Sequence, residues 1–135
     1  MRFTLESDYA IRIVHCLAVS QEKLDANHIA VSSDVSIRFA LKILRKLCIA
    51  EIIQSYKGVQ GGYKLAKEPE KITLKDVIEA VDGKIEVSRC LTQETACSRI
   101  NENNQTCKFK SIFNEVSQLV RNKLDEVNFR DLIEK

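Results

Sequence analysis

A glycine-rich stretch between two short apolar runs is the feature that most restricts the fold of this chain. Three of its four glycines, Gly58, Gly61 and Gly62, lie in the sequence EIIQSYKGVQGGYKLA. Glycine permits the positive φ angles that a tight turn between two strands requires. The sequence therefore predicts a β-hairpin, with one strand over residues 52–56 and a second strand that starts at Tyr63.

Two amphipathic segments near the start of the chain predict helices. In residues 8–19 apolar positions recur every three or four residues, and Ser7 is placed to cap the start. The expected inward positions are Ala10, Ile13, Val14, Leu17 and Ala18. Residues 25–34 predict a short second helix with Ile29 and Ala30 turned inward.

A third helix, from Ser36 to Leu47, follows a cluster of serine and aspartate. Its expected inward stripe is Ile37, Ala40, Leu41, Leu44, Leu47 and Cys48, and its outer positions are Arg38, Lys42, Arg45 and Lys46. Three helices followed by a hairpin are the elements of a winged helix-turn-helix domain. The predicted fold class is therefore mainly α with a small β wing.

Positive charge is concentrated around the third helix and the hairpin. The net charge is only +2, but from Arg38 to Lys67 seven cations accompany a single acid, Glu51. This distribution favours an anionic partner such as nucleic acid over a merely solvated basic surface, which is the alternative.

In a DNA complex of this fold the third helix would enter the major groove. Ser36, Arg38 and Lys42 are then expected near base edges or phosphate. Lys57 and Gly58, at the tip of the hairpin, are expected to reach phosphate or the minor groove, unless the hairpin is an ordinary surface feature.

Two further helical segments follow Pro69. The sequence TLKDVIEAVDG starts at a capping threonine, Thr73, and stops at Gly83. Beyond it, apolar residues at helical spacing predict a long helix: Phe109, Ile112, Phe113, Val116, Leu119, Val120, Leu124 and Val127. We expect this stripe to form a homodimer, because a small winged helix does not obviously cover it; a helix folded back on its own domain is the alternative.

The predicted organisation has three parts. Residues 1–83 form the winged helix-turn-helix with its following helix, residues 84–107 carry the cysteines, and residues 108–135 form the dimerisation helix and tail. No apolar run is long enough to span a membrane, and the first residues lack the apolar core of a signal peptide, so the expected location is the cytoplasm.

Three of the five cysteines, Cys90, Cys97 and Cys107, lie in a polar segment. Cytoplasmic thiols stay reduced, so metal or redox chemistry is a better explanation than a disulfide framework. Zinc is one candidate, but its structural sites usually show paired C-x2-C spacing and a fourth cysteine or histidine nearby, which this segment lacks. Cys16 and Cys48 are set in helices and are expected to be core thiols.

The sequence resembles the Rrf-type, or BadM-type, winged-helix transcriptional regulators along its whole length. The motifs that carry the resemblance are MRFTLESDYAIR at the start, KGVQGGYKLA at the hairpin, ITLKDVIEAVDG before the cysteines, and VNFRDLI near the end. Two positions depart from the family pattern. Glu51 stands where the family usually has glycine, and Leu41 replaces an acid that screens DNA sequences, so the operator sequence cannot be copied from a relative.

The resemblance implies a homodimeric regulator, a repressor, that binds palindromic double-stranded operator DNA. Family members that hold an iron–sulfur cluster carry three cysteines in this loop, which implies that Cys90, Cys97 and Cys107 ligate such a cluster. Thiolates are the preferred protein ligands of these clusters. The implied signal is nitric oxide, redox state, or the supply of iron or clusters.

The resemblance also bears on the fourth ligand. Members with a 2Fe–2S cluster use a histidine three residues beyond the last cysteine, where this chain has Lys110. Nitric-oxide-sensing members hold a 4Fe–4S cluster with an aspartate from the other subunit, and Asp8 is at the matching position. The resemblance thus favours 4Fe–4S over 2Fe–2S; alternatively, Asp8 merely stabilises its helix and pairs with Arg12.

A cluster-free regulator is the second function class. Such a protein would respond to thiol oxidation or dock on a metabolic enzyme, and RNA polymerase is a further conceivable partner. An enzyme is not expected, because neither His15 nor His28 lies in a recognisable constellation of nucleophile and acid; both are interpreted as ordinary helix residues.

Overall fold

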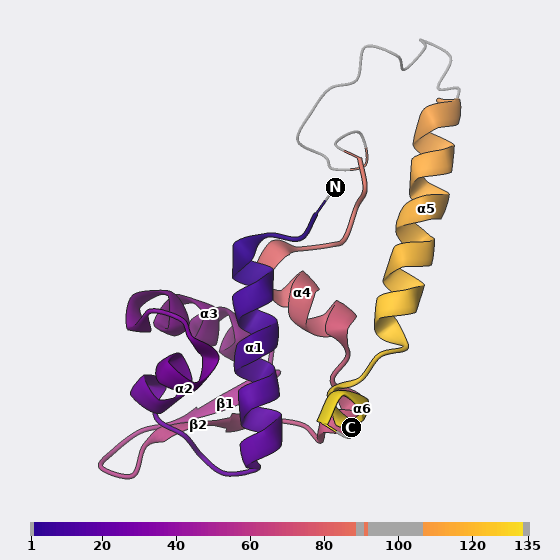
Figure 1. Ribbon diagram of the computed structural model, residues 1–135. Helices are drawn as coiled ribbons and strands as arrows, with labels where there is room; N and C mark the ends of the chain where they lie inside the picture. The colour runs from indigo at the N-terminus through magenta and orange to yellow at the C-terminus, as the bar shows by residue number, and fades with distance from the viewer. Residues whose placement is uncertain (1, 89–90, 92–106, 134–135) are drawn as a thin grey trace.

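The computed structural model describes residues 2–88, 91 and 107–133, and it is mainly helical with one antiparallel pair of strands (Figure 1). The elements are α1 (Leu5–Ser20), α2 (Ala26–Ser33), α3 (Ile37–Ile49), β1 (Ile53–Tyr56), β2 (Gly62–Leu65), the short 3-10 helix η1 (Pro69–Lys71), α4 (Leu74–Asp82), α5 (Lys108–Asp125) and α6 (Phe129–Ile133). This is the predicted fold class.

The first helix, α1, begins earlier than the sequence suggested. Thr4 is its N-cap, because its backbone is extended and its side chain accepts a hydrogen bond from the backbone N–H of Ser7. Ser7 is therefore inside the helix and buried, and its hydroxyl donates to the carboxylate of Asp82. The prediction that Ser7 caps the helix is wrong, whereas the five predicted inward positions are all buried.

Helix α3 packs with a different face from the predicted one. Ala40, Leu44 and Leu47 are buried as expected, and Cys48 is half-buried. Ile37 and Leu41 are instead 41% and 46% exposed, and Ile43 fills the core in their place. The buried stripe is rotated because α3 packs against α1, α2 and α4. The spacing of apolar residues along α3 alone does not reveal where these three helices lie.

The predicted hairpin is present. Ile53 pairs with Leu65 and Tyr56 pairs with Gly62, one residue away from the expected bounds. Gly61 must lack a side chain, because a Cβ there would lie 2.5 Å from the carbonyl oxygen of Tyr56. The hairpin is therefore a narrow wing, attached to the segment after α1 by a bridge between Leu24 and Tyr63.

The last three helices frame one side of the molecule. Helix α4 has the expected threonine cap at Thr73 and ends at Gly83, and α5 runs alongside α4 and beyond it (Figure 1). Val127 does not belong to the long helix, which ends at Asp125. Helix α6, which the sequence did not predict, returns to α1 and places Phe129 in the core.

Candidate functional site

The outer face of α3 is exposed and basic. Arg38, Lys42 and Arg45 are all exposed there, as predicted. Ser36 is the N-cap, and its Oγ accepts a hydrogen bond from the backbone N–H of Phe39 at 3.3 Å. Its hydroxyl can still donate, so the start of α3 offers one neutral donor next to three cations.

One of these cations has a partner that the sequence did not reveal. Lys42 Nζ lies 3.8 Å from Glu6 Oε1, and Lys46 Nζ lies 2.9 Å from the same oxygen. Glu6 belongs to the first turn of α1, far away in the sequence, so only the packing of α1 on α3 brings it there.

The tip of the wing carries the other predicted DNA contacts. Lys57 and Gly58 are exposed, and Gly58 has a φ of 102°, which favours glycine. Lys23, a cation outside the predicted set, lies 5.2 Å from the centre of the Tyr56 ring. The wing therefore has two cations at or near its tip.

Asp8, the predicted fourth cluster ligand, is exposed on α1. Its carboxylate forms an ion pair with Arg12 at 3.1 Å, one turn along the helix. Arg12 in turn lies 5.7 Å from the centre of the Tyr9 ring. The helical ion pair that the sequence offered as an alternative is thus present, and no metal is needed to explain Asp8 in this position.

Only one of the three predicted cysteine ligands falls within the described residues. Cys107 is half-buried and precedes α5, whereas Cys90 and Cys97 lie outside the described part of the chain. Within residues 2–88, 91 and 107–133, no three His, Cys, Asp or Glu side chains come together in a way that could hold a metal ion.

The two helical cysteines are half-buried rather than fully enclosed. Burial raises the pKa of the Cys48 thiol above its usual value of 9.0, and a hydrogen bond with Ser55 partly opposes this shift. A raised pKa keeps Cys48 protonated at neutral pH, which agrees with a structural thiol.

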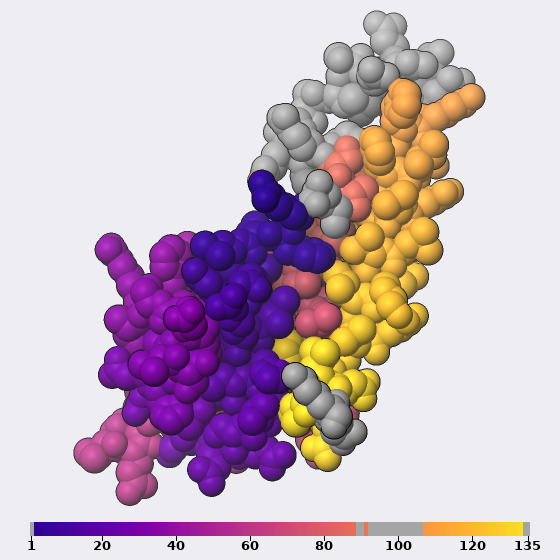
Figure 2. All heavy atoms as spheres, in the orientation of Figure 1, coloured from indigo at the N-terminus to yellow at the C-terminus, as the bar shows by residue number. Residues whose placement is uncertain are grey.

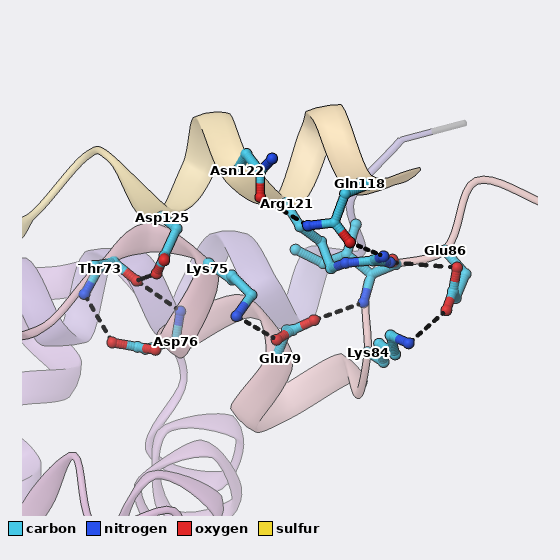
Figure 3. Close-up of polar contacts among 11 residues, drawn as sticks. Thr73, Lys75, Asp76, Glu79, Lys84, Glu86, Gln118, Arg121, Asn122 and Asp125 are labelled. Atoms are coloured by element: carbon cyan, nitrogen blue, oxygen red, sulfur yellow. Dashed lines mark hydrogen bonds and ion pairs between the residues drawn. The ribbon is translucent and has the colours of Figure 1, made fainter. Parts of the chain in front are cut away.

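The chain that leads into the cysteines is fixed to α4 and α5 (Figure 3). Arg121, which is buried on α5, donates to the carbonyl oxygen of Ile85 at 2.6 Å and pairs with Glu86 at 3.4 Å. On the α4 side, Glu79 accepts a hydrogen bond from the backbone N–H of Ile85 at 2.9 Å. We call this group, Glu79, Ile85, Glu86 and Arg121, the clamp.

Sequence reasoning missed the clamp because Arg121 and Ile85 are 36 residues apart and no sequence motif connects them. The one signal was Arg121 itself, a charged residue on a helix with a long apolar stripe.

None of the described helices is long and apolar enough to cross a membrane.

The geometry can be compared with known proteins. Residues 3–135 match the family model of Rrf2, described as an iron-dependent transcriptional regulator. The chain belongs to the Rrf2 family. It is thus a transcriptional regulator with a DNA-binding winged helix and not an enzyme, as predicted.

Similar proteins cover almost the whole chain. The HTH-type transcriptional regulator NsrR of Shouchella clausii is 27% identical over an alignment of 135 positions, which covers 98% of this chain and 89% of that protein. CymR, the global cysteine regulator of B. subtilis, has a TM-score of 0.77 at 21% identity, covering 98% of this chain and 96% of that one. For T. potens IscR the TM-score is 0.76 at 20% identity, with 99% and 87% covered.

Proposed function

We propose that this regulator is a homodimeric repressor that binds palindromic double-stranded operator DNA and responds to nitric oxide, redox state or iron supply through an iron–sulfur cluster. The observation that carries the DNA-binding part is the exposed basic face of α3, with Arg38, Lys42 and Arg45 beside the wing of a winged helix. The proposed parts are residues 1–83 for DNA, 84–107 for the cluster and 108–135 for dimerisation.

On DNA, α3 would lie in the major groove, which is wide enough for a helix. Arg38 can form two hydrogen bonds with guanine, and Ser36 and Lys42 can donate to base edges or phosphate. Lys57, carried by the narrow turn at Gly58, would reach phosphate or the minor groove. Two copies related by a two-fold axis would then require a palindromic operator.

The dimer would form through α5. Helix α5 lies along one edge of the molecule (Figure 2). Its buried residues are polar, Ser117 and Arg121, and Val120 and Leu124 are half-buried. The exposed apolar residues are Phe109, Ile112, Phe113, Val116 and Leu119. Five large exposed apolar residues at helical spacing support a partner, and a second copy of this chain would bury both stripes together.

DNA binding is tested first with the wing lysine. Operators are selected from random duplexes, and affinity is measured at several salt concentrations for the parent and for Lys57→Ala. The loss of one phosphate contact should weaken binding and reduce the slope of log K against log salt by about 0.9. If Lys57→Ala leaves the affinity and the slope unchanged, Lys57 is not part of the DNA interface. If the parent selects no sequence from the random duplexes, the proposal of sequence-specific operator binding is refuted.

The cluster would be held by Cys90, Cys97 and Cys107 of one protomer and by Asp8 of its partner. The donor set fits, because three thiolates suit iron and a carboxylate can complete four ligands, and the exposure of Asp8 leaves its carboxylate accessible to a second chain. When bound, a 4Fe–4S cluster would supply reactivity toward nitric oxide and oxygen. Asp8 would have to leave Arg12 to act as a ligand.

The clamp would connect the cysteines to the rest of the protomer. Glu86 and Arg121 fix the start of the cysteine segment, and Cys107 stands at the start of α5. Ligation that draws the cysteines together would therefore pull on α5 and on the end of α4. This supports a regulator whose dimer geometry depends on the state of its cysteines.

The cluster is tested by anaerobic reconstitution with iron and sulfide. The parent should be brown with charge-transfer absorption, and Asp8→Ala should change its iron content, spectrum and nitric-oxide response. A mixed dimer of one Asp8→Ala chain and one Cys97→Ala chain should keep one intact site. A colourless, iron-free parent that changes DNA affinity on thiol oxidation would instead establish the cluster-free alternative.

A further inference from the structure

Two lysines of the recognition helix converge on a single acid of α1. Glu6 Oε1 lies 2.9 Å from Lys46 Nζ and 3.8 Å from Lys42 Nζ. Lys46 is also tied to α4, because its ammonium donates to the carbonyl oxygen of Val81 at 3.3 Å. Lys46 is thus occupied by two partners within the protomer, whereas Lys42 has one distant contact and is a predicted DNA contact.

The acid is held more firmly than Lys42. The first turn of α1 is fastened to the end of α4, where the hydroxyls of Thr4 and Ser7 both donate to the carboxylate of Asp82. The side chain of Glu6 is only 20% exposed, while that of Lys42 is 59% exposed. Glu6 therefore stays in place, and Lys42 is the partner that is free to turn toward another anion.

We infer that Glu6 is a positioning residue that withholds Lys42 from the DNA backbone. This inference rests on the proposed function, since it takes α3 as the helix that contacts DNA. A lysine ammonium acts as a point charge, so a phosphate gains Lys42 only as the contact with Glu6 is lost. An exposed ion pair is weak, which limits the resulting loss of DNA affinity to about fivefold.

The test is a cycle of four proteins on one selected operator: the parent, Glu6→Gln, Lys42→Ala and the double variant. Glu6→Gln should raise affinity about two- to fivefold and steepen the slope of log K against log salt by up to about 0.9. In the Lys42→Ala background the same change should have little effect. An equal gain in both backgrounds would overturn the inference.

Removal of any acid near DNA raises affinity somewhat, so a charge control is needed. Asp34 is exposed in the turn just before α3, and its φ of 55° is one that asparagine tolerates. Asp34→Asn should give a smaller gain than Glu6→Gln, and that gain should persist with Lys42→Ala. If Glu6→Gln gains no more than Asp34→Asn does, Glu6 has no specific role.

A second variant guards against misfolding. Glu6→Gln combined with Lys46→Met keeps the net charge of the parent and removes the 2.9 Å ion pair from both sides, so that Lys42 is the only lysine that loses its acid. It should bind DNA more tightly than Lys46→Met alone, provided that Lys42 is intact. If the double variant unfolds like the parent but does not bind DNA more tightly than Lys46→Met, the inference is refuted. If the parent binds DNA in that same assay, the proposed function still holds. A parent that binds no DNA would refute both.

Discussion

The buried ion pair of Arg121 and Glu86 is the residue-scale feature with the largest expected effect on stability. The two side chains are only 7% and 9% exposed, and Arg121 also donates to the carbonyl oxygen of Ile85. A buried charge that loses its partner costs far more than the pair contributes, because the remaining ion cannot be solvated. The surrounding structure must therefore depend on both partners together.

We predict that Arg121→Met lowers the free energy of unfolding by about 3 kcal/mol, because it leaves the buried carboxylate of Glu86 with only the exposed Lys84, at 3.5 Å, as a partner. Denaturant unfolding measures the loss. The control is Lys123→Met on the same helix, which breaks an exposed pair with Glu126 and should cost about 1 kcal/mol or less. Glu86→Leu together with Arg121→Met should recover part of the loss; similar effects of the two single methionine variants would contradict the burial argument.

Glu51 has a backbone conformation that is unusual for glutamate. Its φ is 61°, in the left-handed region that favours glycine, and the family resemblance placed a glycine at this position. The turn after α3 thus has a backbone conformation that favours glycine, although glutamate occupies it. We predict that Glu51→Gly stabilises the protein by up to about 1 kcal/mol in denaturant unfolding, while the β-branched Glu51→Val destabilises it. Equal stability of the two variants would show that the turn is not strained.

At the scale of elements, the sequence was sufficient wherever a local rule decides the structure. The cap at Thr73, the stripe of α1 and the glycine-rich hairpin all depend on local rules, and the structure confirms them. The face of α3 was wrong because apolar residues occur all around that helix, at Ile37, Leu41 and Ile49 as well as in the core. Only the positions of its neighbours decide which of them is buried.

The candidate site was predictable in its exposed part and not in its contacts. That Arg38 and Lys42 would be exposed followed from helical spacing, but Glu6 beside Lys42 depends on how α1 crosses α3. Helix α6 was missed because its five residues are too short for a periodic pattern, and Phe129 is buried only through the return of the chain to α1. Such long-range contacts have no local sequence code.

The wing allows a prediction about one element alone. Gly61→Ala would place a Cβ 2.5 Å from the carbonyl oxygen of Tyr56 and 2.9 Å from that of Gly58, so the turn must shift. We expect a destabilisation of about 1–3 kcal/mol and weaker DNA binding, since Lys57 moves with the turn. Gln60→Ala, at an exposed neighbouring position, is the control and should change neither. Gly61→Ala with unchanged DNA affinity would show that the shape of the wing is irrelevant to binding.

At the scale of the whole molecule, α5 is what makes one protomer incomplete. It runs beyond α4 as an extended rod (Figures 1 and 2), and Ile112, Val116 and Leu119 on it are 55%, 39% and 69% exposed. Val120 and Leu124, nearer the body, are half-buried, whereas Phe109 and Ile112 near the start of the helix are each 55% exposed. The seam that we propose therefore lies mainly along the first two-thirds of α5.

We predict that Leu119→Glu dissociates the dimer. Leu119 is 69% exposed in the protomer, so a glutamate there should leave the isolated chain folded, but in a dimer its charge would be buried without a partner at a cost of several kcal/mol. Light scattering measures the mass, and circular dichroism confirms that the helices remain. Asn114→Glu is the matched control, because Asn114 is also exposed on α5 but lies about 140° around the helix from Leu119. A dimeric Leu119→Glu protein, or an equal effect of both glutamates, would place the interface elsewhere. If the monomer forms as expected, it should also lose its preference for palindromic over half-site DNA, since two linked α3 helices are what a palindrome requires.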